Sequence, residues 1–399
     1  MVTENNEQQL SLDSTNTEPA PAAPSTEAPT TDTPAEPTTT DTTPSEVTTE
    51  TTPAEAPVSQ DDGQVSSEET TEATAETPNQ QEFAIIIHGG AGTILKKNMT
   101  DSMEQAYKAK LTEAIKTGHE ILKNGGSSLE AVQRTINVME DSPLFNSAKG
   151  AVFTHEGKNE LDASIMDGAT LNAGAVAGVT NVKNPINLAY EVMTNSEHVL
   201  LSGKGAETFA KEKGIEQVDP SYFFTQRRYD GLQRILEREK QDSISKATAF
   251  YDPFIKDEKF GTVGCVALDK NGNIAAGTST GGMTNKRYNR IGDSPIIGSG
   301  TYANNATCGV SSTGWGEYFI RGQVAYDISA QMEYAEKTLT DATQNVIQEK
   351  LTKLGGTGGI VALDHYGNPS MEFNTEGMYR AYMNDQGELT LGIYKENEN

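Results

Sequence analysis

One segment of the chain occurs twice, and this internal repeat limits the possible folds more than any other feature. Residues 261–282 and residues 356–377 are identical at 11 of 22 positions when the sequence is shifted by 95 residues. Each copy has an apolar run, an Asp-x-x-Gly-Asn turn and a second run, which is typical of a β-hairpin. Two helical patterns lie between the copies, at 317–335 and 339–354. The repeat predicts two layered sheets covered by helices, in the order α, β, β, α.

The first 82 residues differ sharply in composition from the rest of the chain. They contain 20 Thr, 10 Pro and 18 acidic residues but no Lys, Arg or aromatic residue. Such a segment cannot bury enough apolar surface to offset its chain entropy, so we expect 1–82 to be a disordered acidic extension. It holds most of the formal net charge of −26, and the 317 residues of 83–399 carry about −8. That length suits one large α/β domain or two small ones.

Composition also excludes several kinds of partner. The chain has no basic block, and its negative field would repel nucleic acid. No window approaches the roughly 20 apolar residues of a membrane helix, and MVTENNEQQL lacks the features of a secretory signal. We therefore expect a cytoplasmic protein without a nucleic-acid or membrane partner. A Thr/Pro/Glu-rich leader also suits a stalk at a cell surface, which only a start codon further upstream would permit.

The remaining sequence predicts an alternation of strands and helices. The predicted elements are a buried strand at 83–87 entering a Gly-rich loop at 88–92, helices at 101–123 and 127–140, strands between 163 and 180, a helix opening at Pro185, a strand at 198–203, and a partly helical, exposed linker at 225–261. Cys265 and Cys308 form neither a disulfide framework nor a metal-ligand pattern, and we expect both to be small apolar residues in the interior.

The histidines and the Gly-rich loop match none of the common hydrolase or nucleotide-binding motifs. None of the five histidines stands in HExxH, CxxC or a Gly-x-Ser-x-Gly elbow, and HGGAG lacks both G-x-G-x-x-G and a P-loop lysine. Gly and Thr cluster at strand ends, where most such clusters serve only turns and strand packing. A Thr that opens a buried strand after an exposed linker becomes a nucleophile, however, if the chain is cut just before it. Its new α-amine, with a pKa near 8, then serves as the base.

The repeat offers two candidates for this nucleophile, Thr262 and Thr357. Cutting before Thr262 leaves 138 residues, enough to hold the new terminus in a folded unit. Cutting before Thr357 leaves 43 residues, and the preceding glycines follow a helix directly instead of an open linker. We therefore predict that Thr262 is the nucleophile.

Three segments together resemble a known family. Residues 261–322, HGGAG at 88–92 and SPLFNSAKGAVF at 142–153 are similar to the plant-type L-asparaginase/isoaspartyl peptidase family of N-terminal nucleophile (Ntn) hydrolases. The resemblance covers nearly all of 83–399 and none of 1–82. It implies a four-layer αββα Ntn-hydrolase sandwich and autoproteolysis between Gly261 and Thr262, which would give an α subunit ending at 261 and a β subunit of 262–399. It also implies an (αβ)2 assembly and no required redox or organic cofactor.

The resemblance assigns roles to individual residues. Thr262 would attack the substrate side-chain carbonyl, and Thr280 would hydrogen-bond to it. The α-carboxylate would bind Arg290 and the α-amine Asp293. The full implied set comprises Thr262, Thr280, Thr313, Gly314 and Asn146 as catalytic or processing residues; Gly90, Arg290, Ile291, Gly292, Asp293, Thr313, Gly314, Trp315 and Gly316 around the substrate; and the backbone carbonyls of Met139, Glu140, Ser142, Phe145, Ser147 and Lys149 around a structural sodium or potassium ion.

Two residues depart from the family pattern. Asn289 stands where relatives usually have glycine, so the loop that carries Arg290 could follow a different path. Trp315 lies in the substrate loop, either as a rim aromatic or as a side chain that narrows the pocket or stacks on a leaving group. The expected activity is cleavage of isoaspartyl dipeptides and of the L-asparagine side-chain amide. Two alternatives stay open: a glycosylasparaginase, against which MTNK after TSTGG argues, and an unprocessed surface or binding protein.

Overall fold

The computed structural model describes residues 80–244 and 261–395. Nearly all of the predicted extension 1–82 and the second part of the predicted linker lie outside these residues. Within the described ranges, no helix is both long and apolar enough to cross a membrane.

Two β-sheets form the centre of the domain. The strands are β1 (Ala84–Gly92), β2 (Leu161–Asp167), β3 (Ala173–Val179), β4 (Leu200–Ser202), β5 (Val263–Leu268), β6 (Ile274–Thr280), β7 (Thr301–Ala303), β8 (Cys308–Gly314), β9 (Gly358–Asp364), β10 (Pro369–Phe373), β11 (Gly377–Met383) and β12 (Leu389–Tyr394). The larger sheet has the order β12-β11-β1-β5-β6-β2-β3-β4, and the smaller has the order β10-β9-β8-β7. Neighbouring strands are antiparallel except for the parallel pair β3 and β4.

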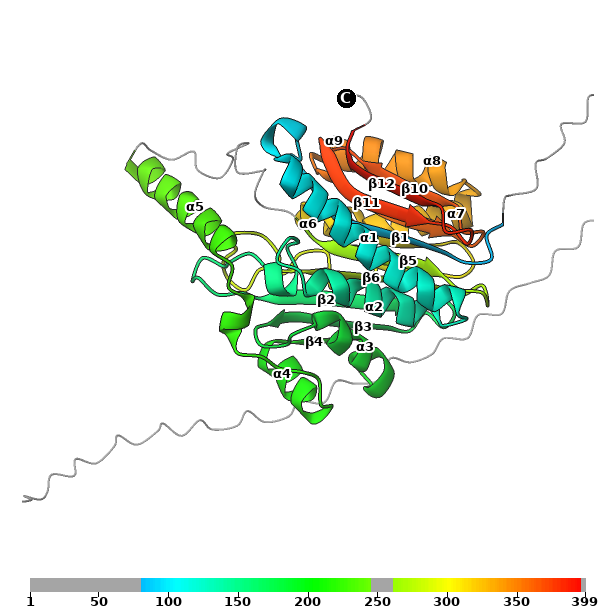
Figure 1. Cartoon of the computed structure of the whole chain (residues 1–399), viewed down its shortest axis with the longest axis horizontal. Helices are drawn as coiled ribbons and strands as arrows, with labels where there is room; N and C mark the ends of the chain where they lie inside the picture. The colour runs from blue at the N-terminus through cyan, green and yellow to red at the C-terminus, as the bar shows by residue number, and fades with distance from the viewer. Residues whose placement is uncertain (1–79, 245–260, 396–399) are drawn as a thin grey trace, which may run out of the picture. The chain divides into compact units, whose positions relative to one another are not determined.

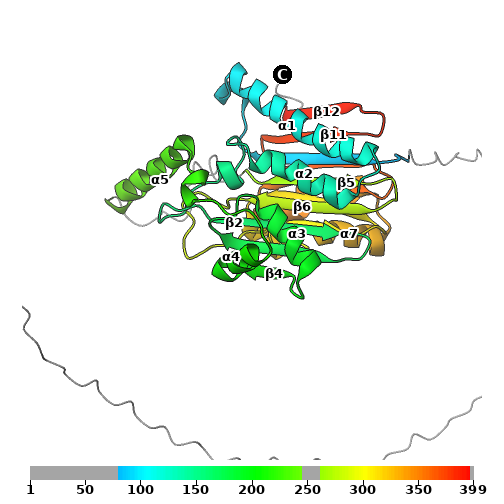
Figure 2. The same ribbon diagram turned by 60° about the horizontal axis from the view of Figure 1, so that its bottom comes forward.

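Helices cover the outer faces of the two sheets, except for the helix Gln226–Ile244, which extends away from them (Figures 1 and 2). They are α1 (Asp101–Lys123), α2 (Ser128–Glu140), α3 (Pro185–Asn195), α4 (Gly203–Glu212), α5 (Gln226–Ile244), α6 (Gly316–Gly322), α7 (Val324–Ala335), α8 (Leu339–Gln344), a π-helical turn at Asn345–Leu351 and α9 (Thr352–Leu354). Figures 1 and 2 show α1, α2 and α3 on the larger sheet, with α7 and α8 on the far side of the smaller sheet. The predicted α, β, β, α order is confirmed.

The strand β1 shows why a continuous apolar run lies at the centre. Ile85 and Ile87 pack in the core beneath the helices, whereas Ala84 and Ile86 pack in the core between the two sheets. Alternate side chains of a strand point to opposite faces, so a strand covered on both faces needs apolar residues at every position. Cys265 on β5 is also buried and unpaired, as expected for a small apolar residue.

The two copies of the repeat form equivalent hairpins in different sheets. Residues 263–280 form the pair β5 and β6 in the larger sheet, and residues 358–373 form β9 and β10 in the smaller one. The strand β9 packs against β5 and β1 across the interface between the sheets. The repeat therefore places one copy in each of the two layers, which the sequence pattern alone did not reveal.

Several predicted boundaries change in the structure. The prediction that HGGAG is a loop was wrong, because β1 continues to Gly92 and pairs with β11 around a bulge between His88 and Gly90. Helix 317–335 is broken at Gln323, whose φ is +46°. The helix α4 was not predicted. Thr100 is the N-cap of α1, since its hydroxyl accepts a hydrogen bond from the backbone N–H of Met103.

Candidate active site

Thr262 stands immediately before β5 and is almost fully buried. Val263 pairs with Ser279 in the antiparallel register of β5 and β6, so Thr262 and Thr280 face each other at the adjacent position. The Thr262 hydroxyl donates to the Thr280 hydroxyl oxygen at 3.1 Å. Thr280 also accepts a hydrogen bond from the backbone N–H of Gly282 at 3.0 Å. The hairpin thus brings together the two threonines that the sequence placed 18 residues apart.

Asn146 and Gly90 lie close to Gly261, the residue that precedes Thr262. The Asn146 amide donates to the Gly282 carbonyl at 2.7 Å, and its side-chain oxygen accepts from the Val152 N–H at 2.9 Å. Gly90 has a φ of +114°, and a Cβ there would lie 2.6 Å from the Cα of Gly261. Glycine is required at this position both for its conformation and for the close approach of the Gly261 backbone.

His88 is a neighbour of Thr262, the predicted nucleophile, that sequence reasoning missed. Burial lowers its pKa to about 3, against the opposing effect of a hydrogen bond to the Thr262 carbonyl. Because a carbonyl only accepts, His88 donates from Nδ1 to the Thr262 oxygen at 3.1 Å, and its unprotonated Nε2 faces the Ser311 hydroxyl at 2.9 Å. A Cβ on Gly264 would collide with both side chains. His88 is therefore a neutral group that orients the backbone of Thr262.

Buried hydroxyl groups continue from Ser311 between the sheets. Ser311 lies 2.7 Å from the Thr278 hydroxyl, which accepts from Thr301 at 2.6 Å. Ser164 lies 2.8 Å from the Thr301 hydroxyl and reaches the Ser294 carbonyl at 2.6 Å. These hydroxyls come from β2, β6, β7 and β8, so the network could not be read from any local motif. A satisfied polar network between the sheets favours one relative placement of the strands that carry the site.

Arg290 and Asp293 form a second group at the same strand ends. Arg290 donates from Nε and Nη2 to the Glu317 carboxylate at 2.9 and 2.8 Å, a bidentate pair. Asp293 is buried, and its Oδ2 has no hydrogen-bond partner among the described residues. Burial raises the pKa of Asp293 to about 7, although Arg290 acts in the opposite direction. A buried, unpartnered carboxylate next to a guanidinium suits a ligand that carries both an ammonium and a carboxylate group.

Two glycines leave the space that the Arg290 and Asp293 side chains occupy. A Cβ at Gly292 would lie 2.7 Å from Arg290 Nη1, and one at Gly316 would lie 2.8 Å from both Arg290 Nη2 and Asp293 Oδ1. Ile291, between the glycine and the arginine, is 39% exposed. The predicted substrate residues Arg290, Gly292, Asp293 and Gly316 therefore lie together.

The substrate loop follows the end of β8. Thr313 is fully buried, and its hydroxyl oxygen accepts from the Ala91 N–H at 3.4 Å, which links the loop to β1. Gly314 has a φ of +156°, and a Cβ there would lie 2.5 Å from the Thr357 carbonyl oxygen. That oxygen also accepts from the Trp315 N–H at 2.9 Å. Thr357, the other copy of the repeat, thus supports the loop through its backbone, and Trp315 is half-buried with its ring edge-on to Tyr318.

Asn289 replaces glycine with a residue that can adopt the same kind of conformation. Its φ is +52°, and the preceding Tyr288 has a φ of +58°. Asparagine tolerates this left-handed region better than most residues. The Asn289 amide donates to Glu160 at 3.3 Å, so the departure from the family pattern changes surface contacts of the loop.

Lys286 is a buried lysine on the same loop as the predicted substrate residues Arg290 and Asp293. Lys286 is 2% exposed at its side chain and pairs with Glu160 at 3.2 Å. Its charge also acts on Asp162, whose pKa is raised by burial and lowered in part by Lys286. Asp162 lies opposite Thr280 in the register of β2 and β6. Lys286, in the MTNK segment, balances two carboxylates directly beside the threonine pair.

The predicted cation loop runs from Met139 to Lys149 and is anchored to the active-site strand. Glu140, fully buried, accepts from the Ser279 hydroxyl at 2.7 Å and from the Ile186 N–H at the start of α3 at 3.1 Å. Burial raises the pKa of Glu140 to about 7. Ser147 joins the same group through a 2.7 Å contact with Ser279. The loop is therefore fixed to β6 one residue before Thr280.

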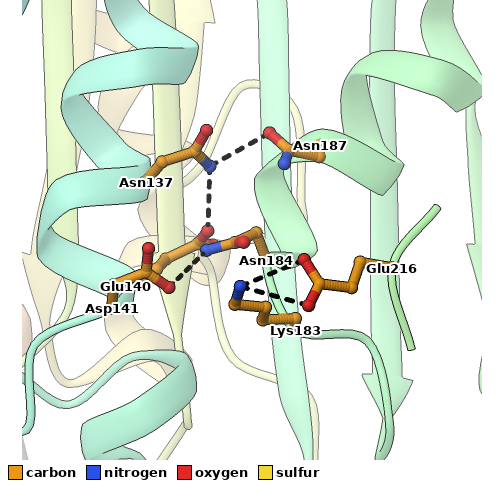
Figure 3. Close-up of polar contacts among 7 residues, drawn as sticks. All are labelled: Asn137, Glu140, Asp141, Lys183, Asn184, Asn187 and Glu216. Atoms are coloured by element: carbon orange, nitrogen blue, oxygen red, sulfur yellow. Dashed lines mark hydrogen bonds and ion pairs between the residues drawn. The ribbon is translucent and has the colours of Figure 1, made fainter. Parts of the chain in front are cut away.

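Amide side chains extend this anchor between α2 and α3. Figure 3 shows Asn137 between Glu140 and Asn187, and Asn184 next to Asp141. The Asn137 amide donates to Asn187 at 3.0 Å, and the Asn184 amide donates to Asp141 at 3.1 Å. These contacts hold the end of α2, where the predicted cation loop begins.

No group of three or more His, Cys, Asp or Glu side chains in the described ranges could hold a metal ion. This finding does not bear on a cation site made of backbone carbonyls. Of the predicted ligands, the Met139 and Ser147 carbonyls accept hydrogen bonds from Ser142 and Gly150. A carbonyl has a second lone pair, so these contacts are compatible with a hard cation.

The α, β, β, α layers, with a buried threonine pair at the start of β5 and a carboxylate and guanidinium beside it, define an N-terminal nucleophile hydrolase. Residues 81–393 match the asparaginase family. The chain is 48% identical over 312 residues to the isoaspartyl peptidase of Escherichia coli (strain K12), covering 78% of this chain and 96% of the relative. It is 40% identical over 317 residues to the plant-type L-asparaginase of Pyrococcus furiosus, covering 76% and 96%. The chain belongs to the asparaginase family.

Proposed function

We propose that the protein is an autoprocessed threonine hydrolase that cleaves isoaspartyl dipeptides and the side-chain amide of L-asparagine. The observation that carries this proposal is the buried Thr262 hydroxyl, 3.1 Å from Thr280 and directly after the glycine packed on Gly90. The names of the relatives, isoaspartyl peptidase and plant-type L-asparaginase, support the substrate class.

The first reaction is the cleavage of the chain itself. The Thr262 hydroxyl attacks the Gly261 carbonyl, the peptide nitrogen leaves as the α-amine of Thr262, and water hydrolyses the resulting ester. Residues up to Gly261 become the α subunit, and residues from Thr262 become the β subunit. Asn146 and Gly90 position the bond, because both pack against Gly261.

The second reaction uses the amine that the first one frees. The α-amine of Thr262 takes the hydroxyl proton while the oxygen attacks the substrate side-chain carbonyl. The Thr313 hydroxyl and the Gly314 N–H stabilise the developing oxyanion, and Thr280 keeps the nucleophile oriented. The amine that leaves the substrate takes this proton from the α-ammonium group of Thr262. Water then hydrolyses the acyl-enzyme.

Substrate binding relies on the zwitterion of the aspartyl residue. The Asp293 carboxylate accepts the α-ammonium group, which supplies the partner that its buried Oδ2 lacks within the described residues. The substrate α-carboxylate displaces the Glu317 carboxylate and takes its place as the partner of the Arg290 guanidinium.

We also propose a structural sodium or potassium ion on the carbonyls of the 139–149 loop, and an (αβ)2 assembly. The ion would add rigidity to a loop already tied to Ser279. Thermal melts in sodium, potassium and tetramethylammonium chloride at equal ionic strength test the ion. Size-exclusion chromatography with light scattering measures the molar mass and so tests the assembly.

The function is tested first on a denaturing gel. The unmodified chain should give two fragments with a new N-terminus at Thr262, and Thr262→Ala should remain one chain without activity. Thr357→Ala is the matched control from the other copy of the repeat and should still be processed. A single full-length band from the folded, unmodified protein would refute the proposal.

Turnover then defines the substrate. β-Asp-Leu and L-asparagine should both be hydrolysed, and a glycosylated asparagine should be hydrolysed much more slowly. A preference for the glycosylated substrate would assign the protein to the glycosylasparaginase alternative. If the processed protein hydrolysed none of these three substrates, the proposed hydrolase activity would be refuted.

A further inference from the structure

A cavity of about 400 Å³ lies on the Gly261 side of the proposed cleavage bond. Its lining includes Gly90, Ala91, Asn146 and Gly261, together with the first two turns of α5. This volume falls within the range of about 300 to 1,000 Å³ that is usual for small-molecule sites. Most of the residues that line this cavity have no role in the proposed reactions.

The position of the cavity relates it to the leaving group of the substrate. The same Thr262 oxygen bonds to the Gly261 carbonyl carbon during processing and to the substrate carbonyl carbon during turnover. The substrate carbonyl carbon therefore reacts beside Gly261, which lines the cavity. Arg290 and Asp293, which bind the aspartyl part in the proposed function, do not line the cavity, so the cavity is available to the leaving group on the other side of the broken bond.

The charged side chains that line the cavity within the described residues are all positive. Among the described residues, its charged side chains are Arg227, Arg228 and Arg234, and no Asp or Glu lines it. Arg228 has a structural role, because it donates to the carbonyls of Gly150 at 2.9 Å and of Leu144 at 3.4 Å. In a domain with a net negative charge, arginine side chains at a cavity wall favour an anionic ligand, although Arg228 and Arg234 both have interactions of their own.

Arg227 is the side chain best suited to receive that anion. Both of its terminal nitrogens contact the neutral Tyr107 hydroxyl at 3.2 Å. Within residues 80–244 and 261–395, no carboxylate pairs with Arg227. Tyr107 is itself held by its bond to Leu144 and by stacking on Tyr379 at 4.1 Å. The guanidinium is thus positioned without being neutralised, and a planar fork matches a carboxylate.

Part of the remaining wall is apolar. Ile94, Met103 and Leu144 line the cavity from three different segments of the chain, beside polar residues such as Thr93 and Asn98. A cavity with an apolar wall and a cationic rim suits an amino acid that carries an apolar side chain and an ionised α-carboxylate. Neither ammonia, the leaving group of L-asparagine, nor a neutral glycosylamine has that carboxylate.

We propose that this cavity is the subsite for the leaving residue of an isoaspartyl dipeptide, with Arg227 binding its α-carboxylate and the apolar wall taking its side chain. The inference rests on the proposed function and deepens it, because it makes the C-terminal residue of the dipeptide a recognised part of the substrate. Arg227 acts here as a specificity residue and takes no part in bond breaking.

The test compares three substrates: β-Asp-Leu, its C-terminal amide and L-asparagine. The unmodified enzyme should prefer the free acid over the amide by about fivefold in kcat/KM, the upper end of the range for a partly exposed charge pair. Arg227→Gln should lower kcat/KM for the free acid by a similar factor, mainly through KM, and should change the other two substrates less than about twofold. Added salt should reduce the preference of the unmodified enzyme for the acid.

Arg134→Gln provides a matched control. Arg134 is an exposed arginine of α2 that does not line the cavity, so this variant makes the same charge change elsewhere and should leave all three substrates unaffected. Equal losses on all three substrates in Arg227→Gln would indicate a structural role and overturn the subsite. Equal rates for acid and amide in the unmodified enzyme would overturn it without any variant. Absence of turnover by the unmodified enzyme would instead refute the proposed function.

Discussion

The hydroxyl oxygens of Thr262 and Thr280 lie 3.1 Å apart at the open end of the β5 and β6 hairpin. Their separation follows from the register of the two strands, in which Val263 faces Ser279. Thr280 is held in turn by the Gly282 N–H. The Thr262 hydroxyl is therefore oriented by a strand pair and not by a flexible loop.

Removal of the Thr280 hydroxyl should slow the chemistry more than it disturbs the fold. Thr280→Val keeps the shape of the side chain but loses both hydrogen bonds, and we expect kcat to fall on the order of 100-fold. Steady-state kinetics on β-Asp-Leu measures this loss. Thr280→Ser retains the hydroxyl and should stay within about tenfold of the unmodified enzyme; equal rates for the Val and Ser variants would contradict the assigned role.

Gly90→Ala should impair processing. The new Cβ would lie 2.6 Å from the Gly261 Cα, on a backbone with φ of +114° that alanine rarely adopts. Displacement of Gly261 should slow or abolish cleavage, measured as the cleaved fraction on a denaturing gel over time. Gly92→Ala is the matched control two residues away, because its Cβ would meet nothing within 4 Å. Normal cleavage in Gly90→Ala would show that this contact is dispensable.

Asp293 should impose a pH dependence on substrate binding. Its pKa is raised to about 7, mainly by burial, and only the ionised form accepts an ammonium group as an ion pair. For the unmodified enzyme, kcat/KM should therefore rise with pH up to about 7. In Asp293→Asn, KM should increase on the order of 100-fold and this part of the pH profile should disappear. An unchanged profile in the variant would contradict the assignment.

The same group should affect stability in the opposite direction. Because the folded pKa lies above the unfolded value of 3.8, the protonated form of Asp293 is favoured in the folded state. Its contribution to the free energy of unfolding is fully present below about pH 4 and is lost as the pH rises through about 7. Melting temperatures of Asp293→Asn should consequently decline less between pH 4 and 7 than those of the unmodified protein. A parallel decline in both proteins would rule out this contribution.

Lys286→Met should destabilise the fold strongly. The substitution leaves Glu160 and Asp162 without their buried cation, and removal of one partner of a buried pair typically costs about 3 to 5 kcal/mol. Urea unfolding in the Thr262→Ala background, which is expected to remain one chain, measures this free energy. Lys270→Met is the control, since its pair with Glu82 is exposed and should contribute about 1 kcal/mol or less. Similar losses in both variants would be inconsistent with a buried role for Lys286.

Local patterns were sufficient for most elements of the fold. The Thr100 cap and Gly125 after α1, the Asp-x-x-Gly-Asn turns and the apolar runs of β1 and β5 act over a few residues, so their signals are written in the sequence. HGGAG was misread because glycines usually mark loops, whereas here pairing of β1 with β11 keeps them in a strand. Contacts between distant segments overrode the local preference.

The sequence by itself led to the prediction that Thr262 is the nucleophile, and the family resemblance of its motifs implied the contact of Thr262 with Thr280 and the roles of Arg290 and Asp293. Only the tertiary structure revealed the neutral His88 under Thr262, the support that Thr357 gives to the substrate loop, and the cavity beneath Arg227. Each of these joins residues more than 40 positions apart. Burial and hydrogen bonding between such segments depend on how the two sheets stack, and no local pattern contains that information.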